Sequence, residues 1–341
     1  MRIIKLSMVA ALIAVVLFAG LSGGQQSLLA YEGETQTQTY VVMAGSSGGN
    51  VGVEMFAPSA LQVHQGDTVR WLLGGFHNIH FEDANIPLLL PLEQDGKSIL
   101  QINPVVAMGN VQSGGNYTGG DANSGLPLGG PPSSNFDLKI DAPPGTYHYF
   151  CDIHAGMTGM IEVTDSSVSL ASPVDSLSAG FKQLFDAQSA GSQAEQAAKA
   201  APVAATDTGV TITIGARAGQ ASIIGFFPNY AEIKVGQSVT WAVPADAMPG
   251  PFGIGSVPLP AQDQLFGIIP AQAGPPTIVI PDVGTNGNLA SGSSVKLGDS
   301  WYTGILDPAE SYTLTFTEPG VYRFSDGGPG QIGVIVVEAA T

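Results

Sequence analysis

One block of residues occurs twice in this chain, and that repeat restricts the possible folds more than any other feature. Residues 56–71 match residues 226–241 without a gap, at an offset of 170 positions. A second pair of blocks, 145–159 and 320–333, matches when small gaps are allowed. Apolar residues alternate with period two in each block, and the runs end at glycine or proline, which indicates β-strands. The sequence therefore predicts two copies of one β-module.

The composition supports this interpretation. A chain of 341 residues is long enough for two domains, each with its own core. It holds 45 glycines and 24 prolines but only 11% charged residues, a mixture that favours short strands and many turns. We expect an all-β chain of two β-sandwiches, over residues 38–165 and 209–339. Each contains a stretch rich in glycine, asparagine and proline, roughly 105–135 and 281–300, where ordered coil or a mobile loop is expected.

Residues 166–208 join the two modules and are rich in serine, alanine and glutamine. Within this linker four apolar residues have the helical spacing i, i+4, i+7, i+8, namely Leu177, Phe181, Leu184 and Phe185. They predict a short amphipathic helix from about 174 to 200, capped by Asp175 or Ser176. We expect its apolar stripe to pack on one of the two sandwiches.

Residues 1–30 have the pattern of an export signal. Arg2 and Lys5 precede an apolar run of roughly 14 residues, which is short for a membrane span of about 20. We expect cleavage near Ala30 and export to the periplasm or the extracellular space. An uncleaved N-terminal anchor is the alternative, and only then is contact with a membrane expected.

The chain is strongly acidic. Its net charge of −17 becomes −19 when Arg2 and Lys5 are removed. Nucleic acid and anionic membrane surfaces are poor partners for such a chain, whereas a basic docking partner is favoured. Simple solubility of an exported protein explains the charge equally well. The residues do not indicate an oligomeric state.

The single cysteine is the centre of a group of metal-binding residue types. Cys151 is followed by His154 and then Met157 in the segment GTYHYFCDIHAGMTGMIEV, and His77 follows a predicted strand that ends at Trp71. A solitary cysteine is more often an inert buried residue, but that explanation accounts for none of these neighbours. One thiolate, two imidazoles and a weak thioether are the donors that suit a type 1 (blue) copper ion. We therefore predict one such copper ion, held by these four side chains.

Strand periodicity separates the predicted ligands from the other histidines. His77 lies in phase with Ile79 and Phe81, two apolar residues, so we expect its side chain to point inward as theirs do. His80 then faces outward and is left out of the site. His148 is out of phase with the tyrosines and the cysteine of its strand, which places it at the surface. Solvent exposure is also expected for His64.

Two methionines compete for the axial position. Met157 follows His154 by three residues and Met160 by six. The shorter tether suits the tight turn that returns the loop across the metal, and Gly156 and Gly159 permit that turn. We expect Met157 to be the axial ligand and Met160 to lie in the core of the following strand.

These segments resemble the cupredoxin family, the plastocyanin and azurin type of blue copper protein. Residues 56–71 resemble its early strands, and FHNIHFEDANIP resembles the segment that carries its first histidine ligand. Residues 151–159 resemble the short C-x2-H-x2-M-x-G loop of amicyanin more than the longer loop of plastocyanin. The resemblance covers about 38–165 well, and 209–339 only in framework.

The resemblance implies Greek-key β-sandwiches and a copper ion that carries single electrons, with His77, Cys151, His154 and Met157 as ligands. It implies that Asn78 braces the two ligand loops by hydrogen bonding beside the cysteine. The ring edge of the second histidine is then the electron port at the surface. Redox partner proteins would dock near it, on a flat apolar rim made by Gly74, Gly75 and Phe76.

The second module departs from this pattern at the ligands. All five histidines lie in the first half of the chain, and Ala247 stands opposite His77. A segment from Phe324 and Ser325 to Gln331 replaces the cysteine loop. Serine is too hard and too basic to replace a thiolate. We expect a degenerate, copper-free sandwich with a structural or docking role.

The sequence thus favours an electron-transfer protein rather than an enzyme. A two-domain copper oxidase or nitrite reductase needs a second copper centre made of several further histidines, commonly in His-x-His pairs, and the chain has no such pair. The other alternative is a copper-binding carrier, or an extracellular structural module whose metal only stabilises the fold.

Overall fold

The computed structural model describes residues 37–82, 86–127, 135–247, 253–265, 267–269, 277–326 and 331–339. The predicted export segment, residues 1–30, lies outside the described residues. Residues Thr37–Thr341 form one compact unit, and the boundaries expected from the sequence at 38–165, 166–208 and 209–339 remain predictions. None of the described helices combines the length and the apolar composition that crossing a membrane requires.

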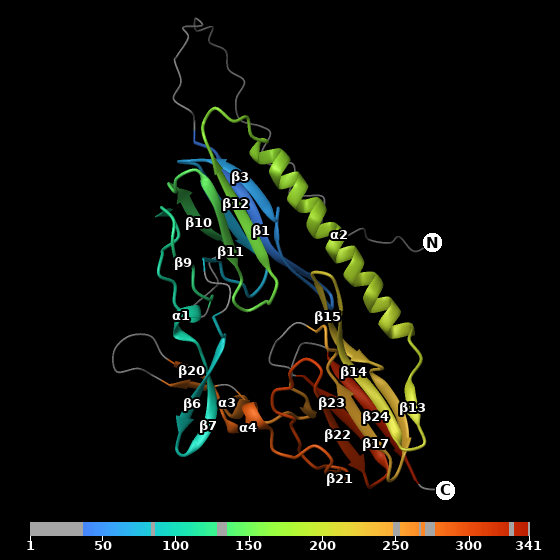
Figure 1. The fold of residues 1–341 in the computed structure, drawn as a ribbon. Coiled ribbons are helices and arrows are strands. Elements are labelled where there is room, and N and C mark those ends of the chain that lie inside the picture. The colour runs from blue at the N-terminus through green and yellow to red at the C-terminus, as the bar shows by residue number, and fades with distance from the viewer. Residues whose placement is uncertain are drawn as a thin grey trace, which may run out of the picture. The chain divides into compact units, whose positions relative to one another are not determined.

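The first module is a sandwich of two sheets (Figure 1). One sheet has the order β2 (Val51–Ala57), β1 (Thr39–Gly48), β4 (Thr68–Leu73), β10 (Asn135–Ile140) and β8 (Gly115–Tyr117). The other has the order β3 (Ala60–His64), β12 (Thr158–Thr164), β11 (Gly145–Phe150), β5 (His80–Phe81) and β9 (Ala122–Asn123). Alternate residues of both sheets are buried between them, as period two predicts. Trp71 is fully buried there, and its ring centroid lies 5.4 Å from that of Tyr149.

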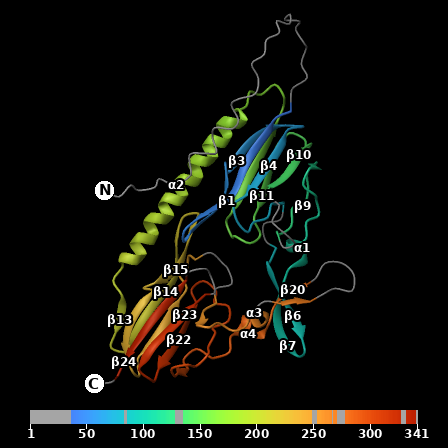
Figure 2. The same ribbon diagram turned by 180° about the vertical axis from the view of Figure 1, so that it is seen from behind.

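The second module repeats this arrangement (Figure 2). Its first sheet has the order β15 (Ala221–Phe227), β14 (Gly209–Ala218), β17 (Ser238–Ala242), β22 (Ser311–Phe316) and β21 (Ser294–Val295), and β13 (Ala204–Thr206) pairs with β14. Its second sheet has the order β16 (Tyr230–Lys234), β24 (Ile332–Glu338), β23 (Gly320–Ser325) and β18 (Gly255–Ser256). Trp241 is fully buried and occupies the place of Trp71. The predicted all-β fold of two Greek-key sandwiches is confirmed.

A bulge occurs at the same place in both modules. The register of β1 shifts between Ala44 and Ser46, and that of β14 shifts between Ile214 and Ala216, 170 residues later. The intervening Gly45 and Gly215 have φ angles of 72° and 73°, the left-handed region that favours glycine. The sequence repeat therefore corresponds to a repeated backbone.

The edge strands β2 and β15 pair with each other and join the two modules through one continuous sheet. Gly52 faces Ser222, Val53 faces Ala221 and Val51 faces Ile223. Residues 170 positions apart are equivalent in the two modules, so the pair Val53–Ala221 corresponds to the pair Val51–Ile223. The pairing therefore has an approximate two-fold axis at Gly52 and Ser222. No sequence pattern predicts this junction, which removes two open sheet edges at once.

The linker contains one long helix, α2 (Pro173–Ala200). Its bounds agree with the helix that the sequence predicts over about 174–200. Ser172, rather than Asp175 or Ser176, is the N-cap, and its side chain accepts a hydrogen bond from the backbone N–H of Asp175. Pro173 explains the early start, because proline suits the first helical position, where no N–H partner is needed.

The helix α2 contacts β1, β2, β14 and β15, so it packs on both modules rather than on one. The predicted apolar stripe is only half correct. Leu184 is buried and Leu177 is half-buried, but Phe181 and Phe185 are 57% and 71% exposed. The closest face of the helix instead carries Gly180 and Gly191, because glycine lets the helix approach the strands beneath it.

The two stretches rich in glycine, asparagine and proline contain more regular structure than the sequence predicts. The first holds the short helix α1 (Pro104–Ala107) with β8 and β9, and the second holds α4 (Asp282–Asn286) and β21. Another short helix, α3 (Gln262–Leu265), lies before the second stretch. Four strands from both modules also form a separate small sheet in the order β19 (Gly267–Ile269), β20 (Thr277–Ile280), β7 (Lys97–Ile102) and β6 (Leu89–Gln94). Pairing of β20 with β7 makes a second connection between the modules.

A larger side chain at Gly191 tests the close packing of α2 on the junction between the modules. A Cβ atom at Gly191 would lie 2.4 Å from Cγ1 of Val51 and 2.8 Å from Cβ of Ala221, one residue in each module. Gly191→Leu should therefore lower the free energy of unfolding by about 1–3 kcal/mol in chemical denaturation, because the helix must move away from both strands. Ala190→Leu, at an exposed neighbouring position, should change it by less than about 0.5 kcal/mol. Equal effects of the two substitutions would contradict the close packing of α2.

Candidate metal centre

The first histidine is held in a slot made by glycines. The chain turns after β4, where the N–H of Gly74 donates to the carbonyl of Ala44 at 2.8 Å. His77 follows and is only 3% exposed. Its Nε2 lies 2.2 Å from the position of a Cβ at Gly45 and 2.9 Å from that of a Cβ at Gly75. Any side chain at these positions would displace the ring, so both glycines fix its orientation.

A tight turn between β11 and β12 carries the other candidate ligands. The N–H of Cys151 donates to the carbonyl of Met157, and the N–H of Met157 donates to the carbonyl of His154, each at 3.0 Å. Gly156 supports this turn with a φ of 84°. Gly159 has a different role from the one expected, because a Cβ there would lie 2.2 Å from the Tyr149 ring.

Three of the four predicted ligands come together. The Sγ of Cys151 lies 3.7 Å from Nδ1 of His77 and 3.5 Å from Nδ1 of His154. Candidate donor atoms of these three residues all lie within 4.8 Å of one another. Such separations suit donors that share one ion, since bonds from a transition metal to imidazole nitrogen or thiolate sulfur are about 2.0–2.3 Å. This thiolate and two imidazoles fit copper.

The two methionines lie on different faces of their segment. Met157 is 1% exposed and belongs to the same buried cluster as Cys151. Met160 is half-buried and lines a surface groove beneath α2 with Pro58 and Ala171, so its predicted place in the core is wrong. Alternation along β12 explains the difference, because Ile161 takes the inward position instead.

The protonation states of the donors follow from burial. Burial, reinforced by the neighbouring His154, lowers the pKa of His77 to about 3. Burial also lowers the pKa of His154, against the opposing charge of Glu54. Burial raises the pKa of the Cys151 thiol to about 11, although backbone hydrogen bonds to its sulfur from Asn78, Ile153 and His154 oppose this. Without metal, both rings are therefore neutral and the thiol keeps its proton at neutral pH.

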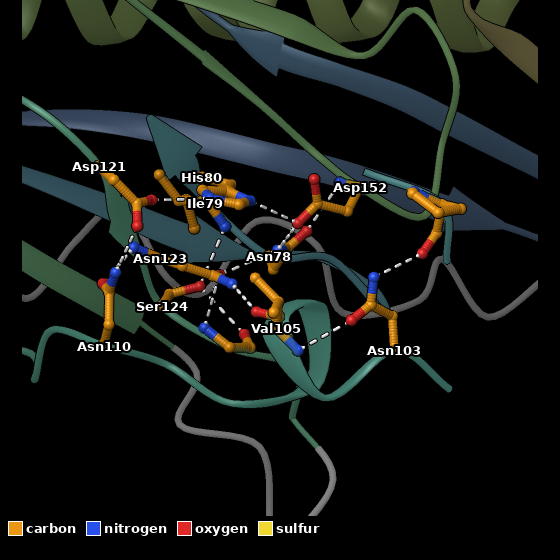
Figure 3. Close-up of polar contacts among 12 residues, drawn as sticks. Asn78, Ile79, His80, Asn103, Val105, Asn110, Asp121, Asn123, Ser124 and Asp152 are labelled. Atoms are coloured by element: carbon orange, nitrogen blue, oxygen red, sulfur yellow. Dashed lines mark hydrogen bonds and ion pairs between the residues drawn. The ribbon is translucent and has the colours of Figure 1, made fainter. Parts of the chain in front are cut away.

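Asn78 connects the two ligand loops (Figure 3). Its Oδ1 accepts a hydrogen bond from the N–H of Asp152 at 2.9 Å, directly after the cysteine. Its Nδ2 donates to Oδ2 of Asp152 at 2.6 Å and to Oδ1 of Asn123 at 3.1 Å. Asn78 is completely buried, and the brace implied by the family resemblance is confirmed.

The prediction that His80 faces outward is wrong. Its side chain is 1% exposed, because Asp152 and Asp121 cover its ring on this face of the sheet. Its Nδ1 lies 2.8 Å from Asp152 and its Nε2 lies 2.9 Å from Asp121 (Figure 3). Burial alone would lower the pKa of His80, but the hydrogen bonds and charges of these two carboxylates outweigh it and raise the pKa. His80 supports the cysteine loop from behind rather than binding the metal.

The remaining histidines lie apart from this group. His148 is exposed, as predicted. His64 is half-buried, and its Nε2 lies 2.9 Å from the carbonyl oxygen of Val168. Over the part of the chain that the structure describes, His77, Cys151 and His154 are the one group of three metal-binding side chains with converging donor atoms.

Glu54, which sequence reasoning does not single out, lies against both histidines. Its Oε2 is 3.5 Å from Nε2 of His154 and 3.7 Å from Nε2 of His77. The side chain of Glu54 is 13% exposed. No short motif marks this residue, because its contact with the ligands depends on tertiary packing.

The second module presents different side chains at the corresponding places. Ala247 is half-buried, and Ser325 is buried at the end of β23. The rest of the segment that replaces the cysteine loop, residues 327–330, lies outside the described residues. At its far end Gln331, which aligns with Met157, donates from Nε2 to Oδ1 of Asn50 in the first module.

A β-sandwich that brings one buried thiol and two imidazoles together in this way is a copper-binding domain of the cupredoxin type. Residues 43–164 match the family of copper binding proteins of the plastocyanin/azurin type. The match covers most of the first module, and copper is the cofactor that the matched family and the three converging donors support.

Solved structures of amicyanin are similar to part of the chain. A methionine-to-glutamine variant in the Cu(I) state is 19% identical, with 39% of this chain and 85% of that chain covered and a TM-score of 0.22. An oxidised methionine-to-lysine variant is also 19% identical, with 39% and 86% covered and the same TM-score.

The pKa shifts predict the proton balance of copper binding. Because the rings are neutral and the thiol is protonated at about pH 7, binding of one copper ion should release about one proton. Between about pH 7 and 10 the apparent affinity should rise about tenfold per pH unit, since the thiolate fraction rises by that factor below a pKa of about 11. Calorimetric titration in buffers of different ionisation enthalpy measures this release. Cys151→Ser is the control that should lose it, and a pH-independent affinity of the unaltered chain would contradict the protonation states.

Proposed function

We propose that this protein carries single electrons between redox partners through a type 1 copper ion bound by His77, Cys151, His154 and Met157. The observation that carries the proposal is the convergence of the buried thiol on the Nδ1 atoms of two imidazoles. Imidazoles suit both oxidation states, and thiolate with a weak thioether stabilises Cu(I). The bound copper supplies the one-electron redox chemistry.

The chain keeps the donors fixed in both oxidation states. Asn78 and the glycines around His77 fix the two loops, and backbone N–H groups directed at the sulfur of Cys151 restrain its position. Met157 lies in the buried cluster, which excludes water from that side. A fixed and largely dry donor set needs little rearrangement when one electron is gained or lost, and outer groups of this kind set the reduction potential.

We further propose that redox partners dock near His154. The His154 side chain is 19% exposed, and Phe76, in the segment that leads to His77, is 46% exposed. An apolar residue beside a metal ligand offers a short contact for electron transfer and a weak apolar docking point. The net charge of −17 favours a basic partner. Export of the mature chain belongs to the same proposal, because a lone thiol outside the cell is protected when a metal binds it.

An electron-transfer role is favoured over catalysis by where the histidines lie. A two-domain copper enzyme needs a further imidazole cluster, whereas His80 is bonded to two carboxylates, and His64 and His148 lie apart from each other in the described part of the chain. A copper carrier or a structural copper module is the other candidate. Reversible electron exchange is the property that distinguishes the three.

Spectroscopy and electrochemistry test the proposed site. The copper-loaded protein should show the intense blue thiolate-to-copper absorption and a reversible one-electron wave at an electrode. Cys151→Ser should abolish the blue colour and keep the fold, since a hydroxyl does not replace the thiolate. His148→Ala, an exposed histidine, is the matched control and should keep both signals. A colourless or redox-silent copper form of the unaltered protein would favour storage or structure.

The axial assignment is tested separately. Met157→Leu should keep the copper and raise its reduction potential, because loss of the thioether disfavours Cu(II). Met160→Leu is the control on the opposite face of the segment and should leave the potential unchanged. The reverse pattern, with a shift only for Met160→Leu, would show that the wrong methionine was chosen.

A further inference from the structure

The carboxylate of Glu54 is shared between the metal centre and the second module. Its Oε2 faces the Nε2 atoms of both candidate ligands, His154 at 3.5 Å and His77 at 3.7 Å. Its Oε1 accepts a hydrogen bond of 2.9 Å from the hydroxyl of Ser222 on β15. Its backbone N–H donates to the carbonyl of Gln220 at 2.7 Å. Two of these four contacts come from the second module.

The space around this carboxylate is shaped by small residues. A Cβ at Gly52 would lie 2.7 Å from Oε1 of Glu54 and 3.1 Å from the hydroxyl oxygen of Ser222. Gly45 and Gly75 leave the Nε2 side of His77 open in the same way. Glycine at these three positions makes room for an acidic side chain against the two rings. The arrangement is a built contact rather than a surface ion pair.

The carboxylate of Glu54 faces the ring nitrogen that bears the proton when each histidine binds a metal through Nδ1. When Nδ1 of an imidazole binds a metal, its remaining proton is on Nε2, and a carboxylate there fixes the ring orientation and raises its basicity as a ligand. A single oxygen placed between the two Nε2 atoms acts on both rings. Its negative charge also favours the more positive oxidation state of a nearby ion.

The contact between Glu54 and Ser222 is not repeated at the position related to it by the approximate two-fold axis. Ile224 occupies the place of Glu54 in the second module and is 51% exposed. Ser222 itself occupies the place of Gly52, on the axis of the β2–β15 pairing. The second module therefore supplies a hydroxyl to the site of the first and has no equivalent carboxylate at the symmetric place.

We propose that Glu54, held by Ser222 of the second module, is a positioning residue of the copper centre that orients both imidazoles and stabilises Cu(II). This inference rests on the proposed ligand set. It gives the module without copper ligands a defined role, which is to fix an outer carboxylate of the other module's metal site.

Reduction potentials of matched variants test the proposal. Glu54→Gln keeps the shape and removes the charge, so the midpoint potential should shift to more positive values while the blue absorption remains. Ser222→Ala should shift it in the same direction by a smaller amount. Glu162→Gln is the control, because this carboxylate accepts a hydrogen bond from Gln62 near the far end of β12, and its removal should leave the potential unchanged.

A double-variant cycle asks whether the serine acts through the glutamate. The Glu54→Gln and Ser222→Ala shifts should not add when combined, because Ser222 has no charge to position once Glu54 is neutral. Full additivity would overturn the proposal. So would a Glu54→Gln potential equal to that of Glu162→Gln.

The apo protein provides a second readout that does not depend on copper. Heteronuclear NMR of the histidine ring nitrogens should show the proton of His154 on Nε2 in the unaltered chain and a changed signal in Glu54→Gln, but not in Glu162→Gln. If the unaltered protein fails to form a blue site, the proposed function fails, and this NMR comparison still decides the Glu54 contact. Identical ring signals in Glu54→Gln and the unaltered chain would contradict it.

Discussion

Strands β2 and β15 pair through Gly52 and Ser222, and both the position of α2 and the surroundings of the metal centre depend on that pairing. It turns two sandwiches into one compact unit by joining two sheet edges that would otherwise be open. It forms the surface on which Gly180 and Gly191 of α2 pack closely. It also places Ser222 against Glu54, beside the two imidazoles.

The metal centre combines local and long-range constraints. The turn that joins Cys151, His154 and Met157 is closed by its own backbone hydrogen bonds. His77 comes from a distant segment, and Asn78 ties that segment to the cysteine loop. Burial keeps the rings neutral and the thiol protonated, so the apo protein holds an uncharged donor set that becomes an anionic one only when metal displaces the thiol proton.

The sequence predicted what depends on local pattern. The repeat and the period-two alternation predicted the two sandwiches. The phase of His77 with Ile79 and Phe81 correctly predicted that its side chain is buried. The same reasoning failed for His80, because Asp121 and Asp152, from other segments of the chain, cover a face of β5 that an isolated strand would expose.

Prediction from local sequence pattern failed for features that depend on contacts between the modules. Phe181 and Phe185 are exposed because α2 uses glycines for its closest approach, a feature that an apolar stripe does not reveal. The role of Glu54 depends on Ser222, 168 residues away, and no local pattern encodes that contact.

X-ray absorption at the copper edge of the loaded protein measures directly whether the thiol and the two imidazoles share one ion. One sulfur at short distance and two imidazole nitrogens are expected around a single copper per chain. A spectrum with only nitrogen and oxygen neighbours would contradict this ligand set.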